Sequence, residues 1–278
     1  MHARAIKDNF NSHASTYDRH SAVQKKVAIR LGSALSVLPG RERLRVLEIG
    51  CGTGHFTLEL LKKLKKPVLI INDIAPAMLK AAMSKPGIKK AAAKALIGDF
   101  MEMDVKVAFD LVTASTVFQW FRDFKALSRK VRSLLAEDGY FVFSMFVEGT
   151  FPELEHSFKK AYRLLFRKEK RHVMDFRKSA DVIGDVRKAG FSIRKTWTES
   201  YVSRFRKPED FLRSLRESGV AGNAGDTGTS RKTDPVEYRI MKTMLRCYND
   251  KYRRKNGVPA SFKALFVIAR KRSGGGRG

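Results

Sequence analysis

The stretch RVLEIGCGTGHF, residues 45–56, constrains the fold more than any other part of this 278-residue chain. Val46 to Ile49 is typical of a buried parallel strand, and a turn containing Gly50, Gly52 and Gly54 follows it. After the turn, apolar residues recur with helical spacing as far as Leu64. A strand, a glycine turn and a helix in this order predict a unit of a doubly wound α/β sheet, whose turn lets a ligand approach the backbone.

Two classes of ligand can use such a turn. A dinucleotide would require the pattern GxGxxG, but the chain has His55 where that pattern needs its last glycine. Glu48 stands two residues before the first glycine, and a carboxylate there suits the ammonium of a methionine moiety better than a pyrophosphate. The stretch, including Cys51, is therefore similar to the S-adenosylmethionine loop of class I methyltransferases, although a glycine motif needs support from its context.

The next two strand candidates each end in an acidic residue. LIINDIAPAML places Asp73 at the carboxyl end of a strand, where it could accept both ribose hydroxyls, and Ile74 would pack on adenine. AKALIGDF ends in Asp99 and Phe100, which in the methyltransferase superfamily meet the adenine amino group and ring. Either aspartate alone would be explained as a turn residue, but their order and spacing together support an S-adenosylmethionine site.

Strand and helix patterns alternate from Arg45 to about Phe146, which predicts a parallel sheet with helices on both faces. FDLVTASTVFQW, residues 109–120, is expected to be a strand leading to the region of the transferred methyl group, and ALFVIARKR a closing strand. We expect a single domain over residues 1–272, with an N-terminal helical cap over 1–40, an inserted helical lid over 148–180, a mobile loop over 219–235, and a disordered tail over 273–278.

The composition of the chain indicates the compartment in which the protein works and the ligands that it lacks. No apolar run reaches the length of a membrane-spanning helix, and MHARAIKDNFNSHA lacks the apolar region of a signal peptide. Cys51 and Cys247 are the only cysteines, and the six histidines lack metal-ligand spacing. We therefore expect a cytoplasmic protein without disulfides, without a metal ion and without membrane contact, and we expect it to be a monomer.

Charge is the second unusual feature of the chain. It has 56 Lys and Arg against 28 Asp and Glu, a net charge of +28, and the excess is denser after residue 150. Such a charge attracts acidic partners, either nucleic acid or an acidic carrier protein, and raises the rate of association with them. A simple effect on solubility is the alternative explanation.

Several segments carry a closer resemblance, which extends over nearly the whole chain. They are FNSHASTYDRHSAVQKKVA (residues 10–28), VLEIGCGTG, DIAPAML, VFQWF, GTFPEL (residues 149–154) and FVIARKR. With them the sequence resembles the malonyl-acyl carrier protein methyltransferases of biotin synthesis. The resemblance implies a Rossmann-like class I fold of the α/β class, with a mostly parallel seven-stranded sheet. It also implies methyl transfer from S-adenosylmethionine to the free carboxylate of malonyl-phosphopantetheine on an acidic acyl carrier protein, which primes pimeloyl synthesis.

The resemblance also assigns roles to residues. A carboxylate is already ionised at neutral pH and needs no general base, so the catalytic residues Tyr17, Gln119 and Trp120 are expected to orient the reactants. Cofactor binding is expected from Tyr17, Gln24, Glu48, Gly50, Cys51, Gly52, Gly54, Asp73, Ile74, Asp99, Phe100 and Ser115. Phe118 is expected to wall the acceptor pocket. An arginine of the lid is expected to bind the carboxylate, and the candidates are Arg163, Arg167, Arg171 and Arg177.

Other classes of methyltransferase remain open. The positive charge favours an RNA methyltransferase, but ASTVFQW stands where enzymes that methylate base amines usually carry an Asn/Asp-Pro-Pro-aromatic motif. Methylation of carbon-5 would require a Pro-Cys nucleophile, which the chain lacks. A quinone- or polyketide-type small-molecule methyltransferase would share the fold and the cofactor. A non-catalytic relative that binds the cofactor is a third alternative.

Overall fold

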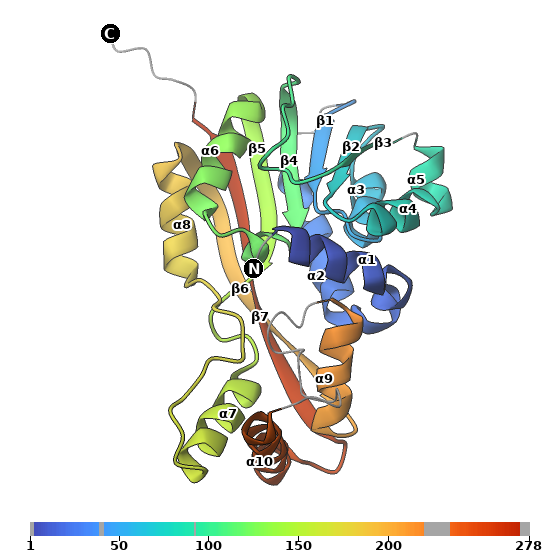
Figure 1. Ribbon diagram of the computed structural model, residues 1–278. Helices are drawn as coiled ribbons and strands as arrows, with labels where there is room; N and C mark the ends of the chain where they lie inside the picture. Colours follow the sequence, from blue (N-terminus) through green and yellow to red (C-terminus); the bar gives the residue numbers. More distant parts are fainter. Residues whose placement is uncertain (1–2, 39–41, 92, 220–233, 273–278) are drawn as a thin grey trace.

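The computed structural model describes residues 3–38, 42–91, 93–219 and 234–272, and it is built around one seven-stranded sheet (Figure 1). The strand order is β3-β2-β1-β4-β5-β7-β6. The strands are β1 (Arg45–Ile49), β2 (Val68–Asp73), β3 (Lys94–Ile97), β4 (Phe109–Ser115), β5 (Leu135–Phe146), β6 (Phe191–Phe205) and β7 (Val258–Lys271). Only β7 runs antiparallel to its neighbours. The predicted mostly parallel seven-stranded α/β sheet is confirmed.

Helices cover both faces of the sheet, as the strand and helix alternation predicts. They are α1 (Ala3–His20), α2 (Ala22–Ala34), α3 (His55–Lys63), α4 (Pro76–Met83), α5 (Pro86–Lys90), α6 (Phe124–Leu134), α7 (Pro152–Leu164), α8 (Ser179–Lys188), α9 (Pro208–Glu217) and α10 (Pro235–Tyr252), with short 3₁₀ helices η1 (Leu35–Val37) and η2 (Phe118–Trp120). Alternate residues of the strands point to opposite faces, so that Leu111 of β4 joins the core under α2 and α3 while Val112 joins the core under α6 and α8.

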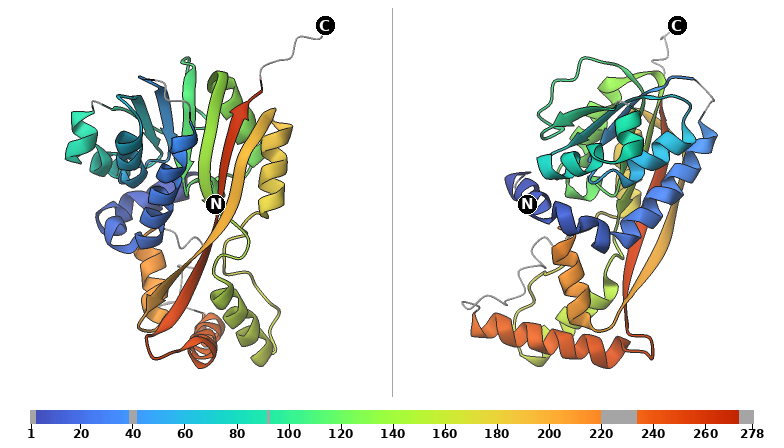
Figure 2. Two further views of the ribbon diagram at one scale, coloured as in Figure 1. Left: turned by 180° about the vertical axis from the view of Figure 1, so that it is seen from behind. Right: turned by 90° about the vertical axis from the view of Figure 1, so that its right-hand side faces the viewer.

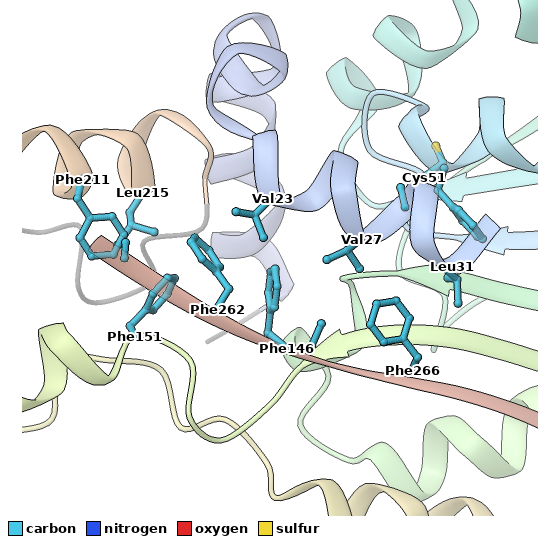
Figure 3. Packing of buried hydrophobic residues seen from close by; sticks show 14 of the residues in the cluster. Val23, Val27, Leu31, Cys51, Phe146, Phe151, Phe211, Leu215, Phe262 and Phe266 are labelled. Atoms are coloured by element: carbon cyan, nitrogen blue, oxygen red, sulfur yellow. The ribbon is translucent and has the colours of Figure 1, made fainter. Parts of the chain in front are cut away.

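The core between α2 and the sheet fixes the position of α2 beside the carboxyl ends of the strands. Figure 3 shows Val23, Val27 and Leu31 of α2 facing Phe146 of β5 and Phe266 of β7. All five side chains are at most 3% exposed. Burial of each such side chain contributes roughly 1.5–3 kcal/mol, so α2 is a firmly packed element.

Strands β6 and β7 continue as a two-stranded ribbon beyond the other strands (Figures 1 and 2). β7 pairs with β5 only as far as Ala264, whereas its residues from Val258 onward pair with β6. Helix α7 starts on this ribbon, because Phe151 N donates to Ser261 O at 2.7 Å and Glu153 Oε2 accepts from Ser261 N at 3.1 Å. Helix α10 packs beside α7. The ribbon thus carries a group of helices away from the main sheet.

One segment differs from the sequence-based expectation, and two others lie outside the described residues. The strand predicted over 109–120 ends at Ser115, because Thr116 adopts a φ of 55° and the chain then turns into η2. The predicted mobile loop lies outside the described residues over 220–233, as does the predicted tail over 273–278.

No helix among the described residues is long and apolar enough to cross a membrane. Within the same residues, no group of three or more histidine, cysteine, aspartate or glutamate side chains is arranged to hold a metal ion.

Candidate active site

A cavity of about 320 Å³ lies at the carboxyl ends of β1, β2 and β4, beneath α1. This is the edge of an open α/β sheet at which ligands bind. Its lining comes from α1, α2, the glycine turn, the ends of β2 and β4, the segment 98–101 after β3, and the segment 120–123 before α6. Its size and its mixed apolar and polar lining are those of a small-molecule site.

The three glycines of the turn have different roles. Gly50, Gly52 and Gly54 have φ values of 65°, 54° and 87°, a region that favours glycine. A Cβ on Gly50 would lie 2.5 Å from Val117 Cγ1, and a Cβ on Gly54 would lie 2.5 Å from Ile88 Cδ1. A Cβ on Gly52 would meet no atom within 4 Å. Two of the glycines therefore allow close packing, whereas Gly52 leaves open space beside the cavity.

Two buried carboxyl groups form the floor of the cavity. Glu48, at the end of β1, accepts a hydrogen bond from Thr57 Oγ1 at 2.6 Å, and burial raises its pKa to about 8. Asp73, at the end of β2, accepts from Gly52 N and Ala75 N, each at 2.8 Å. Burial raises the pKa of Asp73 to about 6, although these backbone donors favour its charged form. A positively charged or hydroxyl-rich ligand would complete the environment of both groups.

The far side of the cavity carries the residues expected to meet adenine. Asp99 Oδ1 accepts from Met101 N at 2.9 Å, and the ring of Phe100 is 2% exposed. Ile74 and Ser115 also line the cavity. Asn72 was not predicted from the sequence, but its Nδ2 donates to Leu96 O and Gly98 O, both at 3.0 Å, and so fixes the segment that carries Asp99.

Three elements bring Tyr17, Gln24 and Trp120 to the same cavity. Phe10 of α1 joins two of them, with its ring centroid 6.4 Å from that of Tyr17 and 5.6 Å from that of Trp120. Within the part of the chain that the structure describes, Tyr17 Oη, the Gln24 amide and Trp120 Nε1 have no hydrogen-bond partner. Burial, and then the nearby Asp73 carboxylate, raise the pKa of Tyr17 above its ordinary value. All three groups are therefore neutral donors available to a ligand.

Three predicted site residues outside the lid, Gly54, Gln119 and Phe118, do not line this cavity. Gln119 donates from Nε2 to Thr116 O at 2.6 Å and accepts at Oε1 from Phe146 N at 3.4 Å, so its amide joins the turn after β4 to the end of β5. Phe118 is fully buried, with its ring centroid 5.3 Å from that of Phe143. Gln119 therefore shapes the turn that carries Trp120, and Phe118 belongs to the core under α6.

The predicted lid and its arginines lie elsewhere. No described residue of 148–180 lines the cavity, because α7 starts on the β6–β7 ribbon. Arg163, Arg167 and Arg171 are exposed, and Arg171 pairs with Asp175. The structure therefore does not bring these three arginines to the candidate site.

Arg177 behaves differently from the other lid arginines. Its guanidinium donates to Phe121 O at 3.2 Å and to Arg122 O, and both of these residues belong to the cavity wall. Arg122 is the only lysine or arginine among the described residues of the lining. Its place directly after VFQWF is the signal in the sequence that could have pointed to it.

Comparisons with known proteins agree with this geometry. A family model described as "Methyltransferase domain" matches residues 17–196. The malonyl-[acyl-carrier protein] O-methyltransferase of Geobacter sulfurreducens is 29% identical over 272 residues, which cover 96% of this chain and 98% of that protein. The enzyme of the same name from a Paenibacillus species is 28% identical, with 95% and 98% covered.

A solved structure shows the same fold. Phosphoethanolamine N-methyltransferase 2 of Haemonchus contortus, in complex with S-adenosyl-L-methionine, superposes with a TM-score of 0.55 over 96% of this chain and 60% of that one. At 17% identity this likeness concerns the fold alone. The family model, in contrast, spans more than half of the sequence and includes the glycine turn, Asp73 and Trp120. The chain therefore belongs to the methyltransferase-domain family.

Proposed function

We propose that the chain transfers a methyl group from S-adenosylmethionine to the free carboxylate of malonyl-acyl carrier protein, giving the methyl ester that primes pimeloyl synthesis for biotin. The observation that carries this proposal is the similarity to enzymes of that name over 96% of the chain. Such a similarity includes the cap helix α1 and the strands β6 and β7, which extend beyond the residues matched by the family model.

The lining of the cavity fits the proposed cofactor. Gly52 leaves open space next to a backbone N–H, and the Asp73 carboxyl group at the end of β2 could accept ribose hydroxyls. Asp99 and Phe100 provide a hydrogen-bonding group and an aromatic ring for adenine, and Glu48 provides a carboxyl group for the ammonium. Bound S-adenosylmethionine supplies an electrophilic methyl group on its sulfonium.

The chain's own residues would orient the acceptor. The malonyl carboxylate is ionised at neutral pH, so no residue has to remove a proton from it. Tyr17, Gln24 and Trp120 offer neutral donors that can hold this carboxylate with less loss of nucleophilicity than a guanidinium would cause. Proximity is then the main source of rate, because both reactants are held in one cavity that α1 closes from water.

The basic face of α7 and α10 supports an acidic carrier as partner. Burial lowers the pKa of His156, and the neighbouring Lys251, Lys160, Arg163 and Lys159 lower it further, so several positive charges gather on this face. Charge reversal by Lys160→Glu with Arg163→Glu should raise KM for the malonyl-loaded carrier and leave KM for malonyl-coenzyme A unchanged. Equal effects on both acceptors would remove the docking role.

The two cysteines are free and buried, in agreement with a cytoplasmic enzyme.

Mass spectrometry tests the proposed reaction directly. Malonyl-loaded carrier is incubated with the protein and S-adenosylmethionine, beside samples with free malonate, malonyl-coenzyme A, RNA or no protein. One added methyl group on the malonyl arm is the expected result. The net charge of +28 favours RNA as the second candidate acceptor, so methylation of RNA alone would replace the proposal.

A further inference from the structure

The carboxylate of Asp18, near the carboxyl end of α1, joins that helix to the glycine turn. Its Oδ1 accepts a hydrogen bond from Thr53 Oγ1 and lies 2.8 Å from His55 Nε2. Its Oδ2 accepts from Lys85 Nζ at 3.1 Å. Lys25 Nζ donates to the Asp18 backbone carbonyl at 2.6 Å. One side chain thus connects α1 with the turn that holds the candidate cofactor and with the start of α5.

The carboxyl group of Asp18 is charged at neutral pH, which strengthens the hydrogen bonds that it accepts. Partial burial raises the pKa of Asp18, but the Thr53 hydrogen bond and the neighbouring His55 and Lys85 lower it more, so the pKa lies below its ordinary value. Burial, and then the charge of Lys85, lower the pKa of His55 to about 4. At neutral pH the imidazole is therefore uncharged, and its Nε2 lies 2.8 Å from the Asp18 carboxylate without the alignment of a hydrogen bond. Hydrogen bonds to a charged group are roughly twice as strong as neutral ones.

Helix α1 packs on α4 and α9 but has no buried apolar face. None of its residues is buried, and its apolar residues Ala3, Ile6 and Phe10 face the cavity. An ordinary surface helix would instead bury such an apolar face against a core. The helix therefore closes over whatever occupies the cavity, and polar contacts hold it in place.

Those other contacts lie on different parts of the fold. Asn11 Oδ1 accepts from Ala77 N at 2.9 Å, and Thr16 Oγ1 donates to Glu217 O at 2.8 Å. Asn9 Nδ2 also donates to Gly219 O at 2.7 Å, so each of these three bonds joins one side chain to one backbone group. Asp18 is the residue through which α1 contacts the glycine turn, by a hydrogen bond from Thr53 and a 2.8 Å contact with His55 Nε2, and it also accepts a hydrogen bond from Lys85.

We propose that Asp18 is a positioning residue that latches α1 to the glycine turn, and that opening of this latch limits the release of the spent cofactor. Neighbouring residues on a helix point about 100° apart, so Tyr17 faces the cavity while Asp18 faces Thr53 and His55. Holding Asp18 therefore holds Tyr17 over the cofactor. The inference rests on the proposed cofactor but not on the proposed acceptor.

The contact with Asp18 explains why the turn carries a histidine at position 55. The turn carries histidine where a dinucleotide fold would carry glycine, and this histidine contacts the cap helix. Because the turn touches both the ligand and Asp18, ligand binding and closure of α1 stabilise each other to the same extent. Cofactor bound at the turn should therefore slow the hydrogen exchange of the backbone amides of α1.

The test compares Asp18→Asn with Asp8→Asn. Asp8 is exposed on the same helix and lies 3.9 Å from Arg4, so it controls for the change in charge. The dissociation rate of S-adenosylhomocysteine is measured by stopped-flow fluorescence of Trp120 in a Trp197→Phe background. Losing bonds to a charged group should raise this rate roughly tenfold or more in Asp18→Asn. The Asp8→Asn rate should equal that of the parent protein.

A second measurement separates the latch from general stability. Hydrogen exchange over residues 3–20 should slow when S-adenosylhomocysteine is added to the parent protein, and should slow far less in Asp18→Asn, at similar melting temperatures. If Asp18→Asn does not fold, Thr53→Val removes one donor of the latch and should show the same effects at smaller size.

Two results would overturn the inference. One is equal dissociation rates in Asp18→Asn and Asp8→Asn. The other is faster exchange throughout the sheet in Asp18→Asn, which would give Asp18 a structural role only. The assays contain no acceptor, so failure of carrier methylation leaves the latch intact. A parent protein that does not bind S-adenosylhomocysteine would refute both the latch and the proposed function.

Discussion

Replacing Glu48 by glutamine tests how strongly the floor of the cavity disfavours a charge. Glu48 is 1% exposed, and its Oε2 accepts from Thr57 Oγ1 at 2.6 Å. A glutamine has the same length, and its carbonyl oxygen can accept the same bond, but it does not titrate. Burial raises the pKa of Glu48 from 4.5 to about 8, and the charge of Asp73 acts in the same direction.

The direction of the pH effect follows from this shift. Between pH 4.5 and about 8 the folded protein keeps a proton on Glu48 that the unfolded chain has lost. Stability therefore falls as pH rises through this window, by about 1.4 kcal/mol per pH unit at most. From about pH 5.5 to about pH 7.5, the free energy of unfolding of the parent protein should fall by about 2–3 kcal/mol relative to that of Glu48→Gln.

Urea denaturation at a series of pH values measures this difference without ligand. Glu102→Gln, at an exposed carboxyl group, is the control and should follow the parent protein at each pH. Parallel stability curves for the parent protein and Glu48→Gln would refute the reasoning, because they would mean that Glu48 titrates alike in the folded and unfolded chains.

The same group links the cofactor to proton release. An ammonium placed beside Glu48 would favour its charged form, so binding of S-adenosylhomocysteine near neutral pH should release a proton. Calorimetry in two buffers with different ionisation enthalpies measures this proton. Glu48→Gln should bind without releasing it, and an unchanged release in this variant would place the ammonium elsewhere.

Three further substitutions separate the roles of the site residues. Asp73→Asn replaces one acceptor oxygen by a donor that faces a backbone N–H. This change should weaken S-adenosylmethionine binding, measured by calorimetry, by about 1.5–3 kcal/mol. An unchanged affinity would mean that Asp73 does not bind the ribose. Trp120→Phe should raise KM for the malonyl-loaded carrier severalfold and leave cofactor affinity unchanged, and the opposite pattern in steady-state kinetics and calorimetry would assign Trp120 to the cofactor. Phe118→Ala should lower the free energy of unfolding by about 3–5 kcal/mol in urea melts, because the ring is fully buried; a change in KM alone at full stability would contradict its place in the core.

The sheet and the family could be predicted because their signals are local. The strand that ends in Glu48, the glycines with positive φ and the following helix lie in one short stretch, and the structure has β1, the turn and α3 there. The prediction of a methyltransferase is confirmed by the family model. The roles of Asp73, Asp99 and Tyr17 stay predictions, although all three residues line one cavity.

The residues on the acceptor side of the cavity were harder to predict, because neighbouring residues of one short segment point in different directions. Phe118, Gln119 and Trp120 are consecutive, yet only Trp120 lines the cavity. Thr116 takes a positive φ, the strand ends early, and a 3₁₀ turn then directs each side chain differently. Neither the pattern of apolar residues nor the motif VFQWF contains this information.

By itself, the sequence determined the order of strands and helices, the glycine turn and the family, since strand, turn and helix signals depend on neighbouring residues. Only the tertiary structure decided that α7 lies on the β6–β7 ribbon instead of over the cavity, and that Asp18, His55 and Lys85 meet. Such contacts join residues far apart in the chain. They depend on how whole elements pack, which spacing along the chain does not encode.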